Sequence, residues 1–312
     1  MRLAVMMPGQ GSQFVGMGRD LAAVDARAKE LFDRADEALG FSLSRVCWEG
    51  PEEELRRTEN AQPAILLHSA IIWSLLPEDV RARAVCGAGH SLGEFSAYFA
   101  AGALTLEDAL RLVRRRGELM AASGDERSGT MAAVIGLEPE SVEEACRRAT
   151  DGDAVVVPAN FNAPGQVVIS GDVSAVEGAM REATELGARK VLPLNVSGAF
   201  HSPLMRSARD GLAAAVEATP MRDPTFPVVA NATASGIRTA EHASRQLVEQ
   251  LTSPVRWVES VETLSAESPD LWVELGPGRV LCNLLKRIDR QFESIPVGTP
   301  DEIEQLVETC NA

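Results

Sequence analysis

The sequence is poor in cysteine, and the few cysteines are scattered along it. There are five among 312 residues, and no two form a C-x-x-C pair. This distribution indicates neither a disulfide framework nor a zinc site, and it fits a reducing compartment. We therefore expect a protein without structural metal.

Positive charge and long apolar runs are also scarce. Thirty Lys and Arg stand against 45 Asp and Glu, a formal net charge of −15. A field of that sign repels nucleic acid and anionic membranes. No segment reaches the ~18 apolar residues of a membrane span, and the apolar run at the N-terminus is too short for a secretion signal. We predict a soluble cytoplasmic protein that binds neither nucleic acid nor membrane.

The remaining composition is that of an ordinary globular chain, with 45% hydrophobic and 24% charged residues. A chain of this length exceeds a typical single core. We expect one large domain that carries a smaller one.

A serine between small residues is the strongest local signal. An apolar strand at 85–87 leads into Gly89-His-Ser91-Leu-Gly93, and a helix rich in small residues follows. This pattern is typical of a nucleophile elbow, in which the glycines permit a tight turn that exposes the serine hydroxyl. Backbone N–H groups at the helix start point toward any negative charge that develops there. The pattern predicts acyl chemistry at Ser91; the alternative is a Gly-rich connection with an exposed serine.

A serine hydroxyl needs a base to become a nucleophile, and the chain offers four histidines. His201 precedes Ser202-Pro203, an N-cap and first helical residue, and is therefore held in place. His68 lies in an apolar helix, His90 is expected to face away from the site, and His242 lies in a polar stretch. We predict that His201 pairs with Ser91.

No Asp or Glu has the context of a third catalytic residue. A helix around 241–252 ends just before Pro254, and its last carbonyls lack partners. We expect a serine–histidine dyad, oriented by an amide or a backbone carbonyl.

A Gly-rich loop follows the first predicted strand, at 9–18. It lacks the Lys-Ser/Thr of a P-loop and the spacing of a dinucleotide fingerprint. It either approaches a ligand, with the amide of Gln10 available, or is shaped only for packing.

One arginine of the helix that begins after Thr105 falls within its apolar stripe. At about 100° per residue, Arg116 points inward, whereas its two neighbouring arginines do not. A guanidinium is rarely buried without a partner. Arg116 therefore binds either an internal carboxylate or a substrate carboxylate.

The segment 128–195 has a pattern of its own, in the order βαββαβ of a ferredoxin-like unit. Asn162 lies in the expected hairpin between its middle strands, where it either stabilises the turn or touches a ligand. The predicted elements are strand 130–137, helix 141–149, strands 154–160 and 166–170, helix 173–186 and strand 190–195. We expect a small domain at 128–195 inserted into a large domain made of 1–127 and 196–312.

Five motifs in order resemble the malonyl-CoA:acyl-carrier-protein transacylase family, including the discrete acyltransferases of polyketide pathways. They are Gly9-Gln-Gly-Ser-Gln13, Gly89-His-Ser-Leu-Gly93, Arg116-Gly117, Ala199-Phe-His-Ser202 and Gln250 before Pro-Val-x-Trp. The resemblance implies an α/β fold: an α/β-hydrolase-like large domain with an inserted ferredoxin-like small domain.

The resemblance also implies roles for individual residues. Ser91 would be the acylated nucleophile and His201 its base, with Gln250 fixing His201 through its main chain. Gln10 and Leu92 would form the oxyanion hole. Arg116 would bind the free carboxylate of a malonyl group as a fork of donors. Phe200 would wall the acyl pocket against bulkier 2-substituted units, and Asn162 is a further substrate-binding candidate.

The implied reaction is ping-pong transfer of malonyl from a coenzyme A thioester, the substrate, to the phosphopantetheine thiol of an acyl carrier protein. No bound cofactor is implied, and we expect a monomer. Carrier proteins are usually acidic, so docking would need a basic cluster: Lys286, Arg287 and Arg290, or Arg189 and Lys190. One alternative is an acyl-carrier-protein hydrolase, or a transferase for an unusual acyl chain, on the same fold. Another is a non-catalytic docking subunit.

Overall fold

The computed structural model describes all 312 residues and contains two β-sheets. The larger has six strands in the order β10-β9-β1-β2-β7-β8, parallel except for β8, which pairs antiparallel with β7. Its strands are β1 (Leu3–Met7), β2 (Ala84–Gly89), β7 (Val228–Val229), β8 (Gly236–Ile237), β9 (Leu271–Leu275) and β10 (Ser294–Val297).

Both faces of this sheet are buried, as expected where helices cover a parallel sheet on each side. Successive side chains of β1 alternate between two cores: Leu3, Val5 and Met7 join the larger one, and Ala4 and Met6 the smaller. The helices are α1 (Arg19–Val24), α2 (Ala26–Leu39), α3 (Leu43–Glu49), α4 (Glu52–Arg56), α5 (Thr58–Leu75), α6 (Glu78–Arg81), α7 (Gly93–Ala100), α8 (Leu106–Glu126), α11 (Arg206–Glu217), α12 (Ala240–Glu249), α13 (Trp257–Ala266), α14 (Val280–Ile288) and α15 (Pro300–Asn311), with short 3₁₀ turns η1 (Pro203–Met205) and η2 (Gln250–Thr252).

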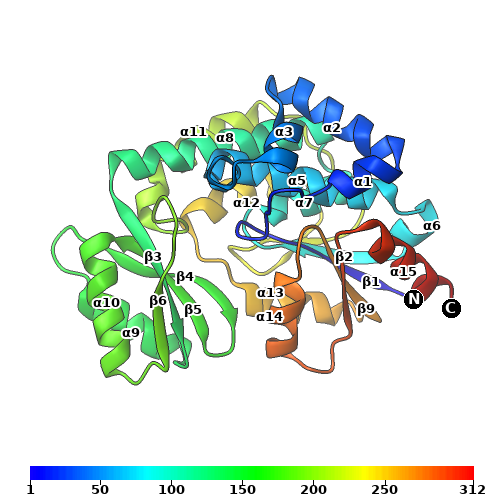
Figure 1. Cartoon of the computed structure of the whole chain (residues 1–312). Coiled ribbons are helices and arrows are strands. Elements are labelled where there is room, and N and C mark those ends of the chain that lie inside the picture. The colour runs from blue at the N-terminus through cyan, green and yellow to red at the C-terminus, as the bar shows by residue number, and fades with distance from the viewer.

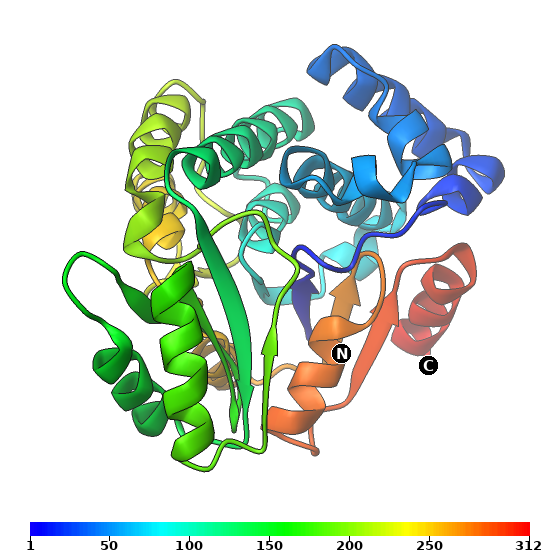
Figure 2. The same ribbon diagram turned by 60° about the vertical axis from the view of Figure 1, so that its left-hand side comes forward.

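The smaller sheet has four strands in the order β4-β5-β3-β6, all antiparallel to their neighbours. Its elements follow the chain as β3 (Gly129–Ile135), α9 (Pro139–Ala149), β4 (Val156–Ala163), β5 (Gln166–Asp172), α10 (Val173–Glu185) and β6 (Lys190–Pro193). The predicted order βαββαβ is confirmed. The unit has its own apolar core of 13 buried residues, and it lies on the side of the molecule away from both chain termini (Figure 1, Figure 2).

Several predicted strand ends are wrong: β3 ends at Ile135 instead of 137, and β6 ends at Pro193 instead of 195. Strand β4 continues to Ala163 instead of ending at Asn160. Asn162 therefore lies in a strand and not in the hairpin loop.

The four-stranded sheet is joined through its backbone to the segment that follows η2. The Phe161 N–H donates to the Val255 carbonyl at 2.9 Å, and the Val255 N–H donates to the Ala159 carbonyl at 2.8 Å. These bonds fix β4 against the segment that follows Gln250. No helix of the chain combines the length and the apolar character needed to cross a bilayer.

Candidate active site

Ser91 stands at the turn between β2 and α7, in the left-handed region with φ 52°. The two flanking glycines are needed for the close approach of strand and helix. A Cβ on Gly89 would lie 1.9 Å from the Gly93 backbone, and one on Gly93 would lie 2.1 Å from the Met7 carbonyl oxygen. Neither neighbour is a side chain that can move away, so the predicted elbow requires glycine at both positions.

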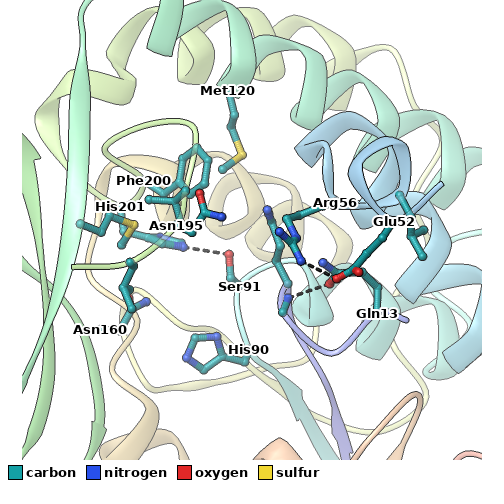
Figure 3. A pocket seen from close by; sticks show the side chains of 16 residues that line it. Gln13, Glu52, Arg56, His90, Ser91, Met120, Asn160, Asn195, Phe200 and His201 are labelled. Atoms are coloured by element: carbon teal, nitrogen blue, oxygen red, sulfur yellow. Dashed lines mark hydrogen bonds and ion pairs between the residues drawn. The ribbon is translucent and has the colours of Figure 1, made fainter. Parts of the chain in front are cut away.

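His201 faces the serine from the other side of the turn. The Ser91 Oγ and the His201 Nε2 are 2.8 Å apart (Figure 3). The His201 Nδ1 lies 2.9 Å from the Gln250 carbonyl oxygen and 3.2 Å from that of Ser253. Because carbonyls only accept, Nδ1 carries the proton and Nε2 is free to accept from the hydroxyl. The structure thus brings the predicted pair together, with a backbone carbonyl orienting the imidazole.

The histidine is 4% exposed. Burial, together with the nearby Arg116 charge, lowers the pKa of His201 to about 3. The imidazole is therefore neutral near pH 7, the form that accepts a proton.

Arg116 is 1% exposed and reaches the serine from α8. Its guanidinium donates to the Gln62 Oε1 at 2.7 Å, to the Ser91 Oγ at 2.9 Å and to the Gln250 Oε1 at 3.1 Å. Gly117 permits this placement, since a Cβ there would lie 2.6 Å from the Glu59 Cα on α5.

No carboxylate forms an ion pair with Arg116, and its Nε has no partner. Burial lowers its pKa to about 10, with the Glu94 charge opposing, so it stays a cation near neutral pH. Of the two alternatives for this inward arginine, the internal ion pair is absent. The site holds a buried cation whose present acceptors are neutral.

The backbone N–H groups of Gln10 and Leu92 donate to no group of the chain. The Gly-rich loop packs on the elbow so closely that a Cβ on Gly9 would lie 2.5 Å from the His90 carbonyl oxygen. The side-chain oxygen of Gln10 accepts from Thr58, which fixes the loop. Two free N–H donors beside a nucleophile can stabilise an oxyanion.

A pocket of about 380 Å³ opens onto Ser91 and His201. Phe200, Met120 and Asn160 line it (Figure 3), and so does Met131. Asn160 and Met131 belong to the four-stranded sheet, whereas Phe200 and Met120 lie outside it. The pocket thus lies between the two parts of the chain.

Two expectations about polar neighbours need correction. His90 does not face away: it lines the pocket, and its Nε2 lies 2.8 Å from the Asn162 Oδ1. Asn162 is thus engaged with His90 and does not line the pocket, whereas Asn160, which the sequence reading did not single out, does.

Three further buried polar residues hold the site, and sequence reasoning missed them. Asn231 accepts the Ser91 N–H at 2.7 Å and donates to the Gly89 carbonyl at 2.8 Å. Glu94 accepts from the Asn231 N–H and from the Gln250 side chain. Gln62 accepts from Arg116. Only Glu94 carried a signal, because it is the one charged residue of the helix directly after the elbow.

The site combines a serine–histidine pair, free N–H donors and a buried cation at the end of a parallel strand. These are the groups that an acyl-transferring serine enzyme needs. Residues 5–307 match the model of the acyl transferase domain family. The chain belongs to this family.

Relatives that match nearly the whole chain show which acyl transferases it is similar to. A malonyl CoA-acyl carrier protein transacylase of Bacillus subtilis is 42% identical over 308 residues, which cover 99% of this chain and 97% of the relative. A malonyl-CoA:acyl carrier protein transacylase from Xanthomonas oryzae has a TM-score of 0.94 at 41% identity, covering 99% of each chain. A malonyl-transacylase solved in complex with a type II polyketide synthase acyl-carrier protein has a TM-score of 0.94 at 39% identity, covering 99% of this chain and 100% of that one. The resemblance inferred from the motifs is confirmed.

Proposed function

We propose that this protein transfers a malonyl group from coenzyme A to the phosphopantetheine thiol of an acyl carrier protein, in fatty-acid or polyketide synthesis. One observation carries the proposal: Arg116, a buried cation without an ion pair, contacts the Oγ of Ser91 at 2.9 Å. An acyl group attached to that oxygen places its free carboxylate within reach of the guanidinium. A bidentate pair of charge-assisted bonds then compensates a charge that is costly to leave buried alone.

In the first half-reaction, His201 Nε2 takes the hydroxyl proton as Ser91 Oγ attacks the thioester carbonyl. The carbonyl oxygen becomes an oxyanion, and the N–H groups of Gln10 and Leu92 donate to it. The tetrahedral intermediate collapses, the C–S bond breaks, and coenzyme A leaves with the proton that His201 held.

In the second half-reaction, His201 takes the proton of the phosphopantetheine thiol, and the sulfur attacks the malonyl ester. The C–O bond to Ser91 breaks, and His201 returns the proton to Oγ. The Gln250 carbonyl holds the imidazole in one tautomer throughout, at 2.9 Å from Nδ1. Each half-reaction uses the same dyad, so no bound cofactor is needed.

The carrier protein is expected to dock beside α14 and β6. The five cations of the two sequence-predicted clusters are exposed, and none forms an ion pair. The clusters also share one surface, because Arg287 donates to Gln166, whose strand neighbour Ile135 pairs with Lys190. An acidic carrier protein fits a surface of unpaired cations.

The domain division also belongs to the proposal: a ferredoxin-like unit at 128–195, inserted in an α/β-hydrolase-like domain of 1–127 and 196–312, acting as a cytoplasmic monomer. The separate apolar core of the four-stranded unit supports it. A hydrolase, or a transferase of monocarboxylic chains, is the second candidate. It would leave the Arg116 charge unpaired, which disfavours it.

Intact-protein mass spectrometry after brief mixing with malonyl-CoA tests the function. The wild type should gain one malonyl group and release coenzyme A, Ser91→Ala should gain none, and added holo carrier protein should remove the adduct. If wild type forms no adduct and releases no coenzyme A, the proposal is wrong. If the adduct forms but only water removes it, the hydrolase is supported.

A further inference from the structure

Glu94 is a carboxylate buried inside the site that the proposed mechanism does not use. It follows the nucleophile by three residues, in the first turn of α7, and is 0% exposed. Burial raises its pKa to about 8, and the Asn231 N–H and the Arg116 charge oppose that rise. A buried ionisable group is costly, so its contacts require an explanation.

The contacts of Glu94 lead to both halves of the site. Its Oε2 accepts from the Asn231 backbone N–H at 2.9 Å and from the Gln250 Nε2 at 3.1 Å. Asn231 in turn holds the turn around Ser91 by accepting the serine N–H. Gln250 holds Arg116, whose guanidinium donates to the Gln250 Oε1 at 3.1 Å.

The route from Glu94 through Gln250 to Arg116 depends on which way the Gln250 side-chain amide faces. An amide has one accepting and one donating end. Because Nε2 donates to the Glu94 oxygen, Oε1 is directed at Arg116. The reverse orientation would set the amide NH₂ against the guanidinium, donor against donor, and would remove the hydrogen bond that Nε2 now donates to Glu94. The Gln250 Nε2 also lies 3.4 Å from the Ser91 carbonyl oxygen, so the Glu94 oxygen, at 3.1 Å, is the nearer of the two acceptors that direct Oε1 toward the substrate-binding arginine.

We propose that Glu94 is a positioning residue of the acyl-transfer site. Its oxygen holds Asn231 and the amide of Gln250, and through them it orients the Ser91 turn and the Arg116 guanidinium. This inference rests on the proposed malonyl transfer. It distinguishes Glu94 from a carboxylate that only stabilises the fold, because the orientation of Arg116 affects malonyl more than acetyl donors.

The chain supplies a matched control. Glu274 on β9 is also 0% exposed and also accepts two N–H bonds, from Leu281 at 3.0 Å and Cys282 at 2.8 Å. It has no hydrogen bond to any residue of the site. Glu274→Ala removes a buried carboxylate with the same number of bonds and leaves the site's hydrogen bonds in place.

The experiment compares acylation of Ser91 by malonyl-CoA and by acetyl-CoA in wild type, Glu94→Ala, Glu94→Gln and Glu274→Ala, with the melting temperature of each. A displacement of about 1 Å in an active site can cost ~10²-fold in rate. We expect Glu94→Ala to lower malonyl kcat/KM by ~100-fold and acetyl kcat/KM by about 10-fold, a tenfold loss of selectivity. Glu94→Gln keeps an accepting oxygen and should stay within about 10-fold of wild type with its selectivity intact. Glu274→Ala should lower the melting temperature and leave the malonyl-to-acetyl ratio unchanged.

A double-mutant cycle with Gln250→Ala isolates the route to Arg116, since the Gln250 backbone carbonyl that holds His201 remains. In that background Glu94→Ala should no longer reduce selectivity, because interacting residues are not additive. An undiminished loss there, or an unchanged malonyl-to-acetyl ratio in Glu94→Ala, would overturn the inference. So would a Glu94→Gln variant as impaired as Glu94→Ala. If Glu94→Ala gives no folded protein, Glu94→Asp, whose oxygen stops one methylene short, takes its place. Absence of malonylation in wild type would instead refute the proposed function.

Discussion

Replacing Arg116 by methionine tests the site most directly. Methionine keeps an unbranched side chain of similar length and removes all donors. A hydrogen bond to a charged group contributes about 1.5–3 kcal/mol, so two to a malonyl carboxylate give about 3–6 kcal/mol. The bonds that Arg116 now makes to Ser91 and Gln250 would be exchanged for them, and the carboxylate loses hydration. A net loss of about 3 kcal/mol is reasonable, which corresponds to roughly a 150-fold lower kcat/KM for malonyl-CoA.

The same substitution should spare acetyl-CoA, which brings no carboxylate. An acetyl group leaves the buried Arg116 cation uncompensated in the wild type. Removal of the guanidinium should therefore leave the rate of acetyl transfer unchanged or raise it. The assay is the rate of coenzyme A release with each donor, checked by the mass of the acyl-enzyme. An equal loss for malonyl and acetyl donors would refute the assignment, because it would mean that Arg116 serves the Ser91 hydroxyl and not the substrate.

Three other outcomes are expected. Because the pKa of His201 is lowered to about 3, the imidazole stays neutral as the pH falls. The value of kcat/KM should therefore stay constant from pH 6.5 down to about pH 5. A fall in kcat/KM near the ordinary imidazole pKa would contradict the buried geometry. Gly93→Ala should lower the free energy of unfolding by about 3 kcal/mol, because its Cβ would lie 2.1 Å from the Met7 carbonyl oxygen. Gly40→Ala should lower it by only about 1 kcal/mol, because nothing lies within 4 Å of the added Cβ. Chemical denaturation of both variants measures the difference. Phe200→Ala should admit methylmalonyl-CoA, and unchanged exclusion of this donor in a mass assay would remove Phe200 from the pocket wall.

Sequence patterns predicted correctly the features that depend only on interactions between residues near each other in the chain. The glycines around Ser91, the Ser202-Pro203 helix start after His201 and the inward side of α8 follow from sterics, capping and helical periodicity. The element order of the small unit follows from alternating strand and helix patterns. The errors arose where a contact with another segment of the chain decides the structure. The apolar run alone does not predict the end of β4, because pairing with β5 extends the strand beyond that run. Local sequence also gives the wrong orientation for His90, because that orientation depends on Asn162, 72 residues further along the chain.

The sequence by itself singled out Ser91, His201 and the inward Arg116, since each stands in a local pattern that constrains its backbone or its direction. Only the tertiary structure decided what those residues meet. Asn231 and Gln250 reach the elbow from segments 140 and 159 residues away in the chain, and no periodicity encodes such a pairing. That Arg116 has no carboxylate partner was likewise undecided until the fold placed Gln62, Ser91 and Gln250 around it. Burial and hydrogen-bond satisfaction are properties of the assembled core, and they made the difference between a structural ion pair and a buried cation that no carboxylate of the chain compensates.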